Sequence, residues 1–133
     1  MVCLLQWLMK VDGSAMVDDR WERSQGGYGR SRVLQDGNVF EKAGCNVSVV
    51  HGNLPKAAQK QMTSRGVDLG NNSDEDLPFY ACGISLVFHP HNPMAPTVHA
   101  NFRYFEVDVT KEDGTTEKVW WFGGELLMLV GDS

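Results

Sequence analysis

The stretch TVHANFRYFEVDV at residues 97–109 is the longest part of the sequence that alternates like a β-strand. Successive side chains of a strand point to opposite faces, so its residues divide into two sets. One set is mixed and largely polar: Thr97, His99, Asn101, Arg103 and Phe105. The other is mainly apolar: Val98, Ala100, Phe102, Tyr104 and Glu106. The stretch predicts a long strand whose first set resembles neither a core face nor an ordinary solvent-exposed face.

The segments on either side predict neighbouring strands. Residues 84–89 (ISLVFH) indicate the preceding strand, and residues 118–122 (KVWWF) indicate a returning strand after a charged turn at 111–117. Residues 89–96 contain three prolines, which donate no backbone hydrogen bonds, so we expect a rigid surface loop there. Connections this short favour antiparallel pairing.

The first half of the chain predicts helices at its ends and strands between them. Residues 1–11 indicate a helix, and residues 54–65 a second one with Pro55 in its first turn. The charges and glycines of residues 12–32 indicate a loop that runs into a strand. Residues 33–50 indicate strands, with an Asp-Gly hairpin turn inside them.

These elements together predict an α+β fold of one or two helices and about six antiparallel strands. Residues 66–77 are polar and acidic and should form a loop. Tyr104, Phe105, Trp120 and Trp121 indicate that both faces of the sheet are covered, and helices are the expected cover. So few helices are predicted that the flanking layers are expected to be only partly present.

Composition narrows the function classes. A chain of 133 residues suits one domain, and a formal net charge of −5 argues against a nucleic-acid or anionic-membrane binder. No apolar run reaches the length of a membrane span, and the start lacks the features of a signal peptide or the arginines of a mitochondrial presequence. The three cysteines form no CxxC pair, so neither a zinc knuckle nor a disulfide framework is predicted.

The most informative chemistry lies on the mixed face of residues 97–109. His99, Asn101 and Arg103 follow one another there at a spacing of roughly 7 Å. Arginine binds a carboxylate through a planar fork, asparagine adds a neutral donor, and histidine can move a proton near neutral pH. Two interpretations remain open from spacing alone, a pocket for a carboxylate ligand and a structural polar network on an exposed face.

The remaining motifs give weaker indications of function. His89 and His91 form an H-x-H pair that invites a metal site, but Pro90 lies between them and no third ligand is evident, so solvated loop histidines are the alternative. The glycines at 26–29 lack the continuation of a phosphate-binding loop, and a bulge or close backbone approach is expected instead.

Three stretches resemble one enzyme family. They are DRWERSQGGYGRSRVLQDGNVFEKAGCNVSVVHG (19–52), GISLVFHPHNPMAPTVHANFRYFEV (83–107) and WWFGG (120–124). In this order they resemble the oxygen-dependent coproporphyrinogen III oxidases. The segment GNLPKAAQKQMTSRG (52–66) looks most like the animal version.

The resemblance implies a fold, an activity and a site. Members are homodimers with a large, flat antiparallel sheet flanked by helices. They use molecular oxygen, without a metal or organic cofactor, to convert two propionates of coproporphyrinogen III into vinyl groups, giving protoporphyrinogen IX. His99 then matches the proton donor, and the substrate-binding positions match Ser85, Asn101, Phe102 and Arg103. The segment from Leu34 to Ala43 matches a dimer contact of the family. The family makes further dimer contacts through the C-terminal half of its fold, which is expected to be missing from this sequence.

The sequence also departs from the family pattern. After Gly124 the family continues with another glycine, an acidic residue and Thr-Pro, whereas this chain has Glu125 and an apolar tail. We therefore expect a partial family domain at 1–124 and a non-family tail at 125–133. The chain alone is expected to be inactive and to self-associate. The alternatives are a non-catalytic fragment that binds a carboxylate-rich tetrapyrrole or pairs with full-length subunits, and a small-ligand module.

The expected compartment follows from the resemblance too. An animal-type enzyme works in the mitochondrial intermembrane space and other versions in the cytoplasm, and this chain carries no recognisable targeting segment.

Overall fold

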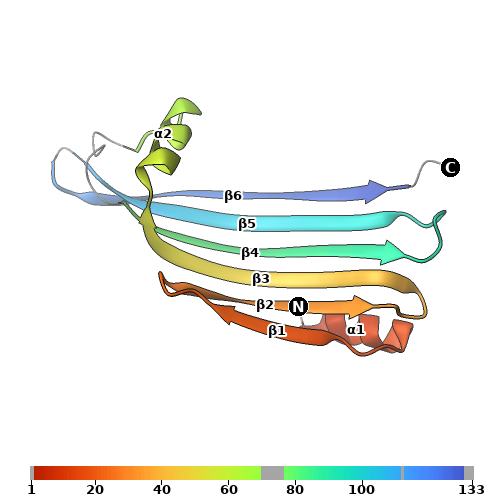
Figure 1. The fold of residues 1–133 in the computed structure, drawn as a ribbon. Helices are drawn as coiled ribbons and strands as arrows, with labels where there is room; N and C mark the ends of the chain where they lie inside the picture. Colours follow the sequence, from red (N-terminus) through yellow and green to blue (C-terminus); the bar gives the residue numbers. More distant parts are fainter. Residues whose placement is uncertain (1, 70–76, 112, 131–133) are drawn as a thin grey trace.

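The computed structural model describes residues 2–69, 77–111 and 113–130, and its centre is a six-stranded antiparallel sheet. The strands follow one another in chain order from β1 to β6, so every neighbour in space is a neighbour in sequence (Figure 1). The elements are α1 (Val2–Asp12), β1 (Val17–Glu22), β2 (Gly27–Gln35), β3 (Phe40–Leu54), α2 (Lys56–Ser64), β4 (Leu77–Pro90), β5 (Thr97–Thr110) and β6 (Thr116–Leu129). The predicted α+β class with an antiparallel sheet is confirmed.

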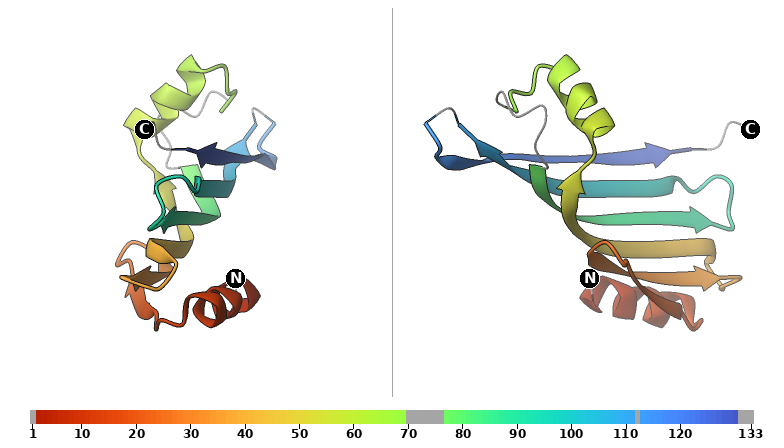
Figure 2. Two further views of the ribbon diagram at one scale, coloured as in Figure 1. Left: turned by 90° about the vertical axis from the view of Figure 1, so that its right-hand side faces the viewer. Right: turned by 60° about the vertical axis from the view of Figure 1, so that its left-hand side comes forward.

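The two helices lie on opposite faces of the sheet (Figure 2). Leu8 of α1 packs with Cys45 of β3, and partly buried residues of β4 such as Leu86 join them. On the other face, Ala58 and Met62 of α2 pack against a cluster that includes the fully buried Val107. We call the first surface the α1 face and the second the α2 face. Phe102 and Tyr104 of β5 belong to the α1 face, and Asn101, Arg103 and Phe105 to the α2 face.

The sheet is wider at its first edge than the sequence predicts. Residues 12–32 were expected to be a loop running into a strand, but they contain β1 and most of β2. The prediction is wrong because the strand VDDRWE is an edge strand with exposed, charged side chains. Asp18 of β1 is held across the pair by Arg30 and Arg32 of β2, and the hydrogen bond from Arg30 is the main reason that the pKa of Asp18 lies well below its usual value.

Three other boundaries differ from the prediction. Pro55 precedes α2 instead of lying in its first turn. β4 continues through Pro90, where a bulge in β3 between Phe40 and Lys42 accommodates the pairing. β6 extends from Thr116 to Leu129, well beyond the predicted 118–122, and runs through the start of the predicted tail.

Asp12 fixes α1 to the turn between β2 and β3. Its side chain is fully buried, and its Oδ1 accepts the backbone N–H groups of Val39 at 2.8 Å and Phe40 at 2.9 Å. The side-chain amide of Asn38 donates to the Asp12 carbonyl at 2.6 Å. A Cβ at Gly37 would collide with the Asp12 carboxylate, so glycine is needed for this close approach.

Among the described residues, neither helix is long and apolar enough to cross a membrane.

Candidate functional site

Four of the five residues predicted for the site lie together on the α2 face. His99, Asn101 and Arg103 follow one another along β5, as the alternation predicts. Ser85 of β4 pairs directly with Asn101, and directly paired residues of an antiparallel sheet point to the same side. The strand register therefore brings a serine, a histidine, an amide and a guanidinium into one patch of the sheet.

A polar band crosses the sheet through Asn101. Ser85 continues the band to Asn46 of β3, and Asn46 continues it to Ser31 of β2, whose hydroxyl donates to the Asn46 side chain at 3.0 Å. On the other side, Asn101 pairs with Glu125 of β6. The band thus joins five neighbouring strands, and hydroxyl, amide and carboxylate groups follow one another across them.

Arg103 is flanked by glycines on the two neighbouring strands. Its cross-strand partners are Gly83 on β4 and Gly123 on β6, neither of which carries a side chain. The resulting open hollow has a volume of about 430 Å³. Arg103 is exposed, and within the described ranges no ion pair is recorded for its guanidinium. The cation is therefore available to a ligand.

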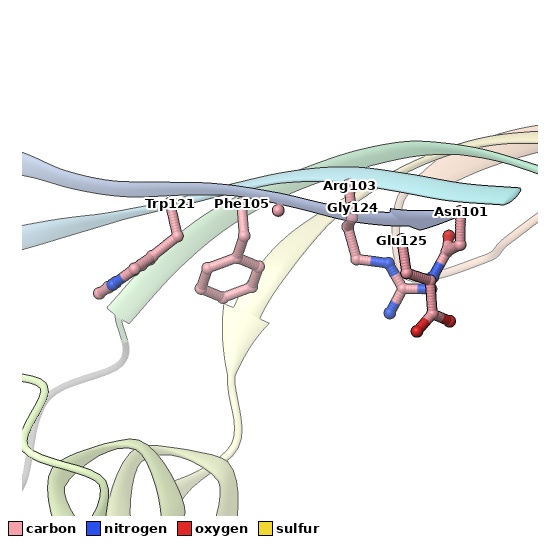
Figure 3. Close-up of a pocket in the computed structure, with 7 residues that line it drawn as sticks. Asn101, Arg103, Phe105, Trp121, Gly124 and Glu125 are labelled. Atoms are coloured by element: carbon pink, nitrogen blue, oxygen red, sulfur yellow. The ribbon is translucent and has the colours of Figure 1, made fainter. Parts of the chain in front are cut away.

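Aromatic side chains form one end of this hollow. Phe105 and Trp121 line it next to Arg103, with ring centroids 5.7 Å apart. Figure 3 shows both rings, Arg103, Asn101 and Glu125 pointing to the side of the sheet where α2 lies. The hollow is therefore apolar at the α2 end and polar at the other, which suits a ligand with an apolar body and charged groups at its rim.

A second, smaller hollow lies beside the first on the same face. It has a volume of about 210 Å³, and Ser85 and His99 line it together with Asn46 and Gly44. His99 is about two-fifths exposed, and its Nδ1 lies 3.9 Å from Oε1 of Glu125. The imidazole can therefore exchange a proton with solvent or with a ligand in this hollow.

Phe102 lies apart from the other four. Its side chain is on the α1 face, where it is 42% exposed and pairs across the sheet with Ile84 and Gly124. A Cβ at Gly124 would collide with the Phe102 ring, so glycine lets the ring lie over β6. A ligand on the α2 face can meet Phe102 only through its main chain, since the alternation directs the side chain to the opposite surface.

The α1 face carries a separate polar group. The carboxylate of Glu106 accepts the Tyr104 hydroxyl at 2.6 Å and the Lys118 ammonium at 2.6 Å. The bond from Lys118, then that from Tyr104, lowers the pKa of Glu106, and the same phenol–carboxylate bond raises the pKa of Tyr104. Because Lys118 also contacts Asp108 at 3.2 Å, its charge is fully engaged, so the group stabilises the pairing of β5 and β6 and offers no free cation to a ligand carboxylate.

His89 and His91, the two histidines of the H-x-H pair, have separate partners. The His91 ring lies 2.8 Å from the carbonyl of Gly37, and the His89 ring lies 3.3 Å from the hydroxyl of Thr97. Within residues 2–69, 77–111 and 113–130, no three His, Cys, Asp or Glu side chains come close enough together to hold a metal ion.

Sequence reasoning missed some residues of the site. Glu125 fell in the expected tail, although a period of two from Trp121 along one strand would have placed it on the Trp121 face. Asn46, Ser31 and the flanking Gly83 join the site through the strand register, and a single sequence does not reveal register.

Comparison with known proteins identifies the family to which this chain is similar. The family model described as coproporphyrinogen III oxidase matches residues 3–128. The human mitochondrial oxygen-dependent coproporphyrinogen-III oxidase is 58% identical over 120 residues, which cover 90% of this chain and 25% of the human protein. The oxygen-dependent enzyme of Drosophila melanogaster is 58% identical over 106 residues, 80% of this chain and 26% of the relative.

A plant enzyme is also similar to this chain. The chloroplastic oxygen-dependent coproporphyrinogen-III oxidase of Nicotiana tabacum is 51% identical over 124 residues, 92% of this chain and 30% of that protein. The chain belongs to the coproporphyrinogen III oxidase family. It spans a quarter to three-tenths of the length of these relatives. The domain boundary at residue 124 stays a prediction.

Proposed function

We propose that this chain supplies the substrate-binding sheet of an oxygen-dependent coproporphyrinogen III oxidase. In that reaction each of two propionates reacts with one O₂. The propionate carboxyl leaves as CO₂, its side chain becomes a vinyl group, and the two electrons and two protons released reduce O₂ to H₂O₂. Molecular oxygen is the oxidant, and we propose that neither a metal nor an organic cofactor takes part. The relatives carry this oxygen dependence in their names.

The observation that carries the proposal is the available Arg103 between two glycines. A guanidinium forms two parallel hydrogen bonds with a carboxylate, and a propionate of the substrate provides that group. Gly83 and Gly123 leave room for the bulky tetrapyrrole to approach the sheet on either side of Arg103. Phe105 and Trp121 give its apolar parts a surface to contact.

The remaining residues of the row have distinct roles in this proposal. Ser85 and Asn101 donate hydrogen bonds to the substrate, and the main chain at Phe102 contributes to the same surface. His99 is the proton donor or relay, since it faces the second hollow and reaches solvent. Removing solvent when the substrate covers the face strengthens each of these polar contacts.

The proposed dimer contact lies at the β2–β3 hairpin. Leu34 and Ala43 are both fully buried within the chain. We therefore propose that the exposed turn between them, including Val39 at 41% exposure, makes the contact with a second copy. Asp12 fixes the shape of this turn. By likeness to the animal relatives, we propose the mitochondrial intermembrane space as the compartment.

A second candidate is a non-catalytic chain that binds the tetrapyrrole or pairs with full-length subunits. It is favoured by β6, on which Trp120, Phe122 and the residues from Leu126 to Leu129 are strongly exposed. Apolar surface of this extent marks a site of association. Production of protoporphyrinogen with oxygen uptake by the purified chain, assayed with coproporphyrinogen III, would exclude the non-catalytic candidate.

Binding of coproporphyrin III, the stable and fluorescent oxidised form of the substrate, tests the carboxylate contact. Arg103→Ala should weaken its binding by about 1.5–3 kcal/mol, the range for a hydrogen bond to a charged group. Arg20→Ala is the matched control, because it removes an exposed arginine of the opposite face. An unchanged affinity of Arg103→Ala, or an equal loss in the control, would rule out the proposed contact.

A further inference from the structure

One negative side chain stands inside the proposed carboxylate-binding site. Glu125 lines the larger hollow together with Arg103 and Asn101. It pairs directly with Asn101, and its Oε1 lies 3.9 Å from Nδ1 of His99. A carboxylate at this position opposes any ligand carboxylate that reaches the same end of the row.

The charges divide the row into two unequal ends. Towards Phe105 and Trp121 the ionisable group is Arg103, flanked by glycines. At the other end, His99 borders the smaller hollow, and its Nδ1 lies 3.9 Å from Oε1 of Glu125, which pairs with Asn101 between His99 and Arg103. Arg32 borders the smaller hollow as well, but its guanidinium is engaged with Asp18 at 3.1 Å.

We propose that Glu125 is a specificity-determining residue, which admits a ligand carboxylate at the Arg103 end and disfavours a second one at the His99 end. The inference rests on the proposed function, because it concerns the same face and the same class of ligand. As a consequence, Glu125 would determine the orientation in which the ligand binds. A ligand with several carboxylates must place one on Arg103 and present a neutral or hydrogen-bond-donating part to Glu125.

The position of Glu125 favours an electrostatic role over a structural one. Its side chain is 55% exposed, and within the described part of the chain its close charged neighbour is His99. The β5–β6 pairing is held independently by its backbone ladder and by the Lys118 contacts with Glu106 and Asp108. Glu125→Gln keeps the size of the side chain, so the fold should be retained.

The test compares two porphyrins on one set of variants. Coproporphyrin III carries four carboxylates and deuteroporphyrin IX carries two. At roughly 6 Å and an effective dielectric constant of about 60, removing one repulsive charge strengthens binding about fivefold. Glu125→Gln should therefore bind coproporphyrin III about fivefold more tightly, and deuteroporphyrin IX by less than about twofold. Salt at about 0.5 M should largely abolish the difference.

Two variants are matched to this substitution. Glu125→Asp keeps the charge and should keep the wild-type preference between the two porphyrins. Glu117→Gln makes the same change on the same strand and face, roughly 27 Å along β6, where Glu117 pairs with Lys111. It should leave both affinities unchanged.

The outcomes separate the inference from the proposed function. If Arg103→Ala weakens binding while Glu125→Gln changes neither affinity, the inference is wrong and the proposed function stands. Equal gains for both porphyrins, or a gain in Glu117→Gln, also overturn the inference. If coproporphyrin III binds to none of the proteins, both proposals are overturned.

Discussion

Removing the Asp12 carboxylate should loosen the β2–β3 hairpin and lower the stability of the whole sheet. Asp12→Ala deletes two charge-assisted hydrogen bonds, from the N–H groups of Val39 and Phe40. Each such bond contributes about 1.5–3 kcal/mol, but Val39 is 41% exposed and water can replace part of its loss. We expect a decrease of about 3 kcal/mol in the free energy of unfolding. Asp12→Asn keeps one acceptor and should cost about 1 kcal/mol.

The pH dependence of this effect has a definite sign. Burial opposes ionisation of Asp12, but the N–H groups of Phe40 and Val39, with smaller contributions from Ser14 and Asn38, lower its pKa overall. A carboxyl group whose pKa is lower in the folded state stabilises the fold fully above its unfolded value of about 3.9. That stabilisation is lost as the pH falls through the folded pKa. The gap between wild type and Asp12→Asn should therefore be constant above about pH 5 and shrink on acidification.

Urea unfolding followed by tryptophan fluorescence, at pH 7 and at several values below pH 4, measures both effects. Asp19→Asn is the control, since Asp19 is an exposed carboxylate on edge strand β1. The interpretation of Asp12 as a clamp fails if Asp12→Ala lies within about 0.5 kcal/mol of the control, the usual range for surface substitutions. It also fails if the gap between wild type and Asp12→Asn widens at low pH.

Three further predictions concern the two faces of the sheet. In a full-length context, His99→Ala should lower the turnover of coproporphyrinogen III about 100-fold, the lower end of the range for a general acid or base, and intact turnover with weaker binding would assign His99 to positioning alone. Gly123→Ala should fold normally, since nothing lies within 4 Å of its added Cβ, and it should weaken porphyrin binding. Gly124→Ala should instead lower the free energy of unfolding by about 1–3 kcal/mol, because its Cβ clashes with the Phe102 ring. Thermal melts and porphyrin titrations of that pair would refute the assignment of faces if the two effects were reversed. Phe122→Lys with Met128→Lys should reduce self-association in sedimentation velocity, because both exposed side chains lie on the α1 face of edge strand β6, and unchanged association would exclude that face.

Much of the fold could be predicted because alternation and turn chemistry act locally. The Asp-Gly turn placed the β2–β3 hairpin, and the period of two placed β5 and its faces. β1 could not be predicted, because its exposed, charged residues do not alternate between core and solvent. Its pairing depends on contacts from Asp18 to β2, which are visible only when the two strands are together.

The candidate site could be predicted along one strand but not across strands. His99, Asn101 and Arg103 follow from the alternation of β5 alone. The neighbourhood of Arg103, with its two glycines, depends on the register of β4 and β6, which a single sequence does not specify. Phe102 shows the limit of assigning roles by motif, since its side chain points away from the residues on either side of it.

The central claim, that the tetrapyrrole binds on the α2 face beside Arg103, can be tested with two adjacent tryptophans. Trp121 lies on this face next to Phe105, whereas Trp120 lies on the α1 face and stacks on Tyr104 at 6.2 Å. The ring current of a bound porphyrin shifts nearby nuclear resonances strongly and distant ones little. The measurement is a titration of ¹⁵N-labelled chain with coproporphyrin III, in which the indole N–H resonances are assigned through Trp120→Phe and Trp121→Phe. A large shift of the Trp121 signal with a nearly stationary Trp120 signal is the predicted result. A larger shift of Trp120, or no shift of either at saturating porphyrin, would contradict the proposed site.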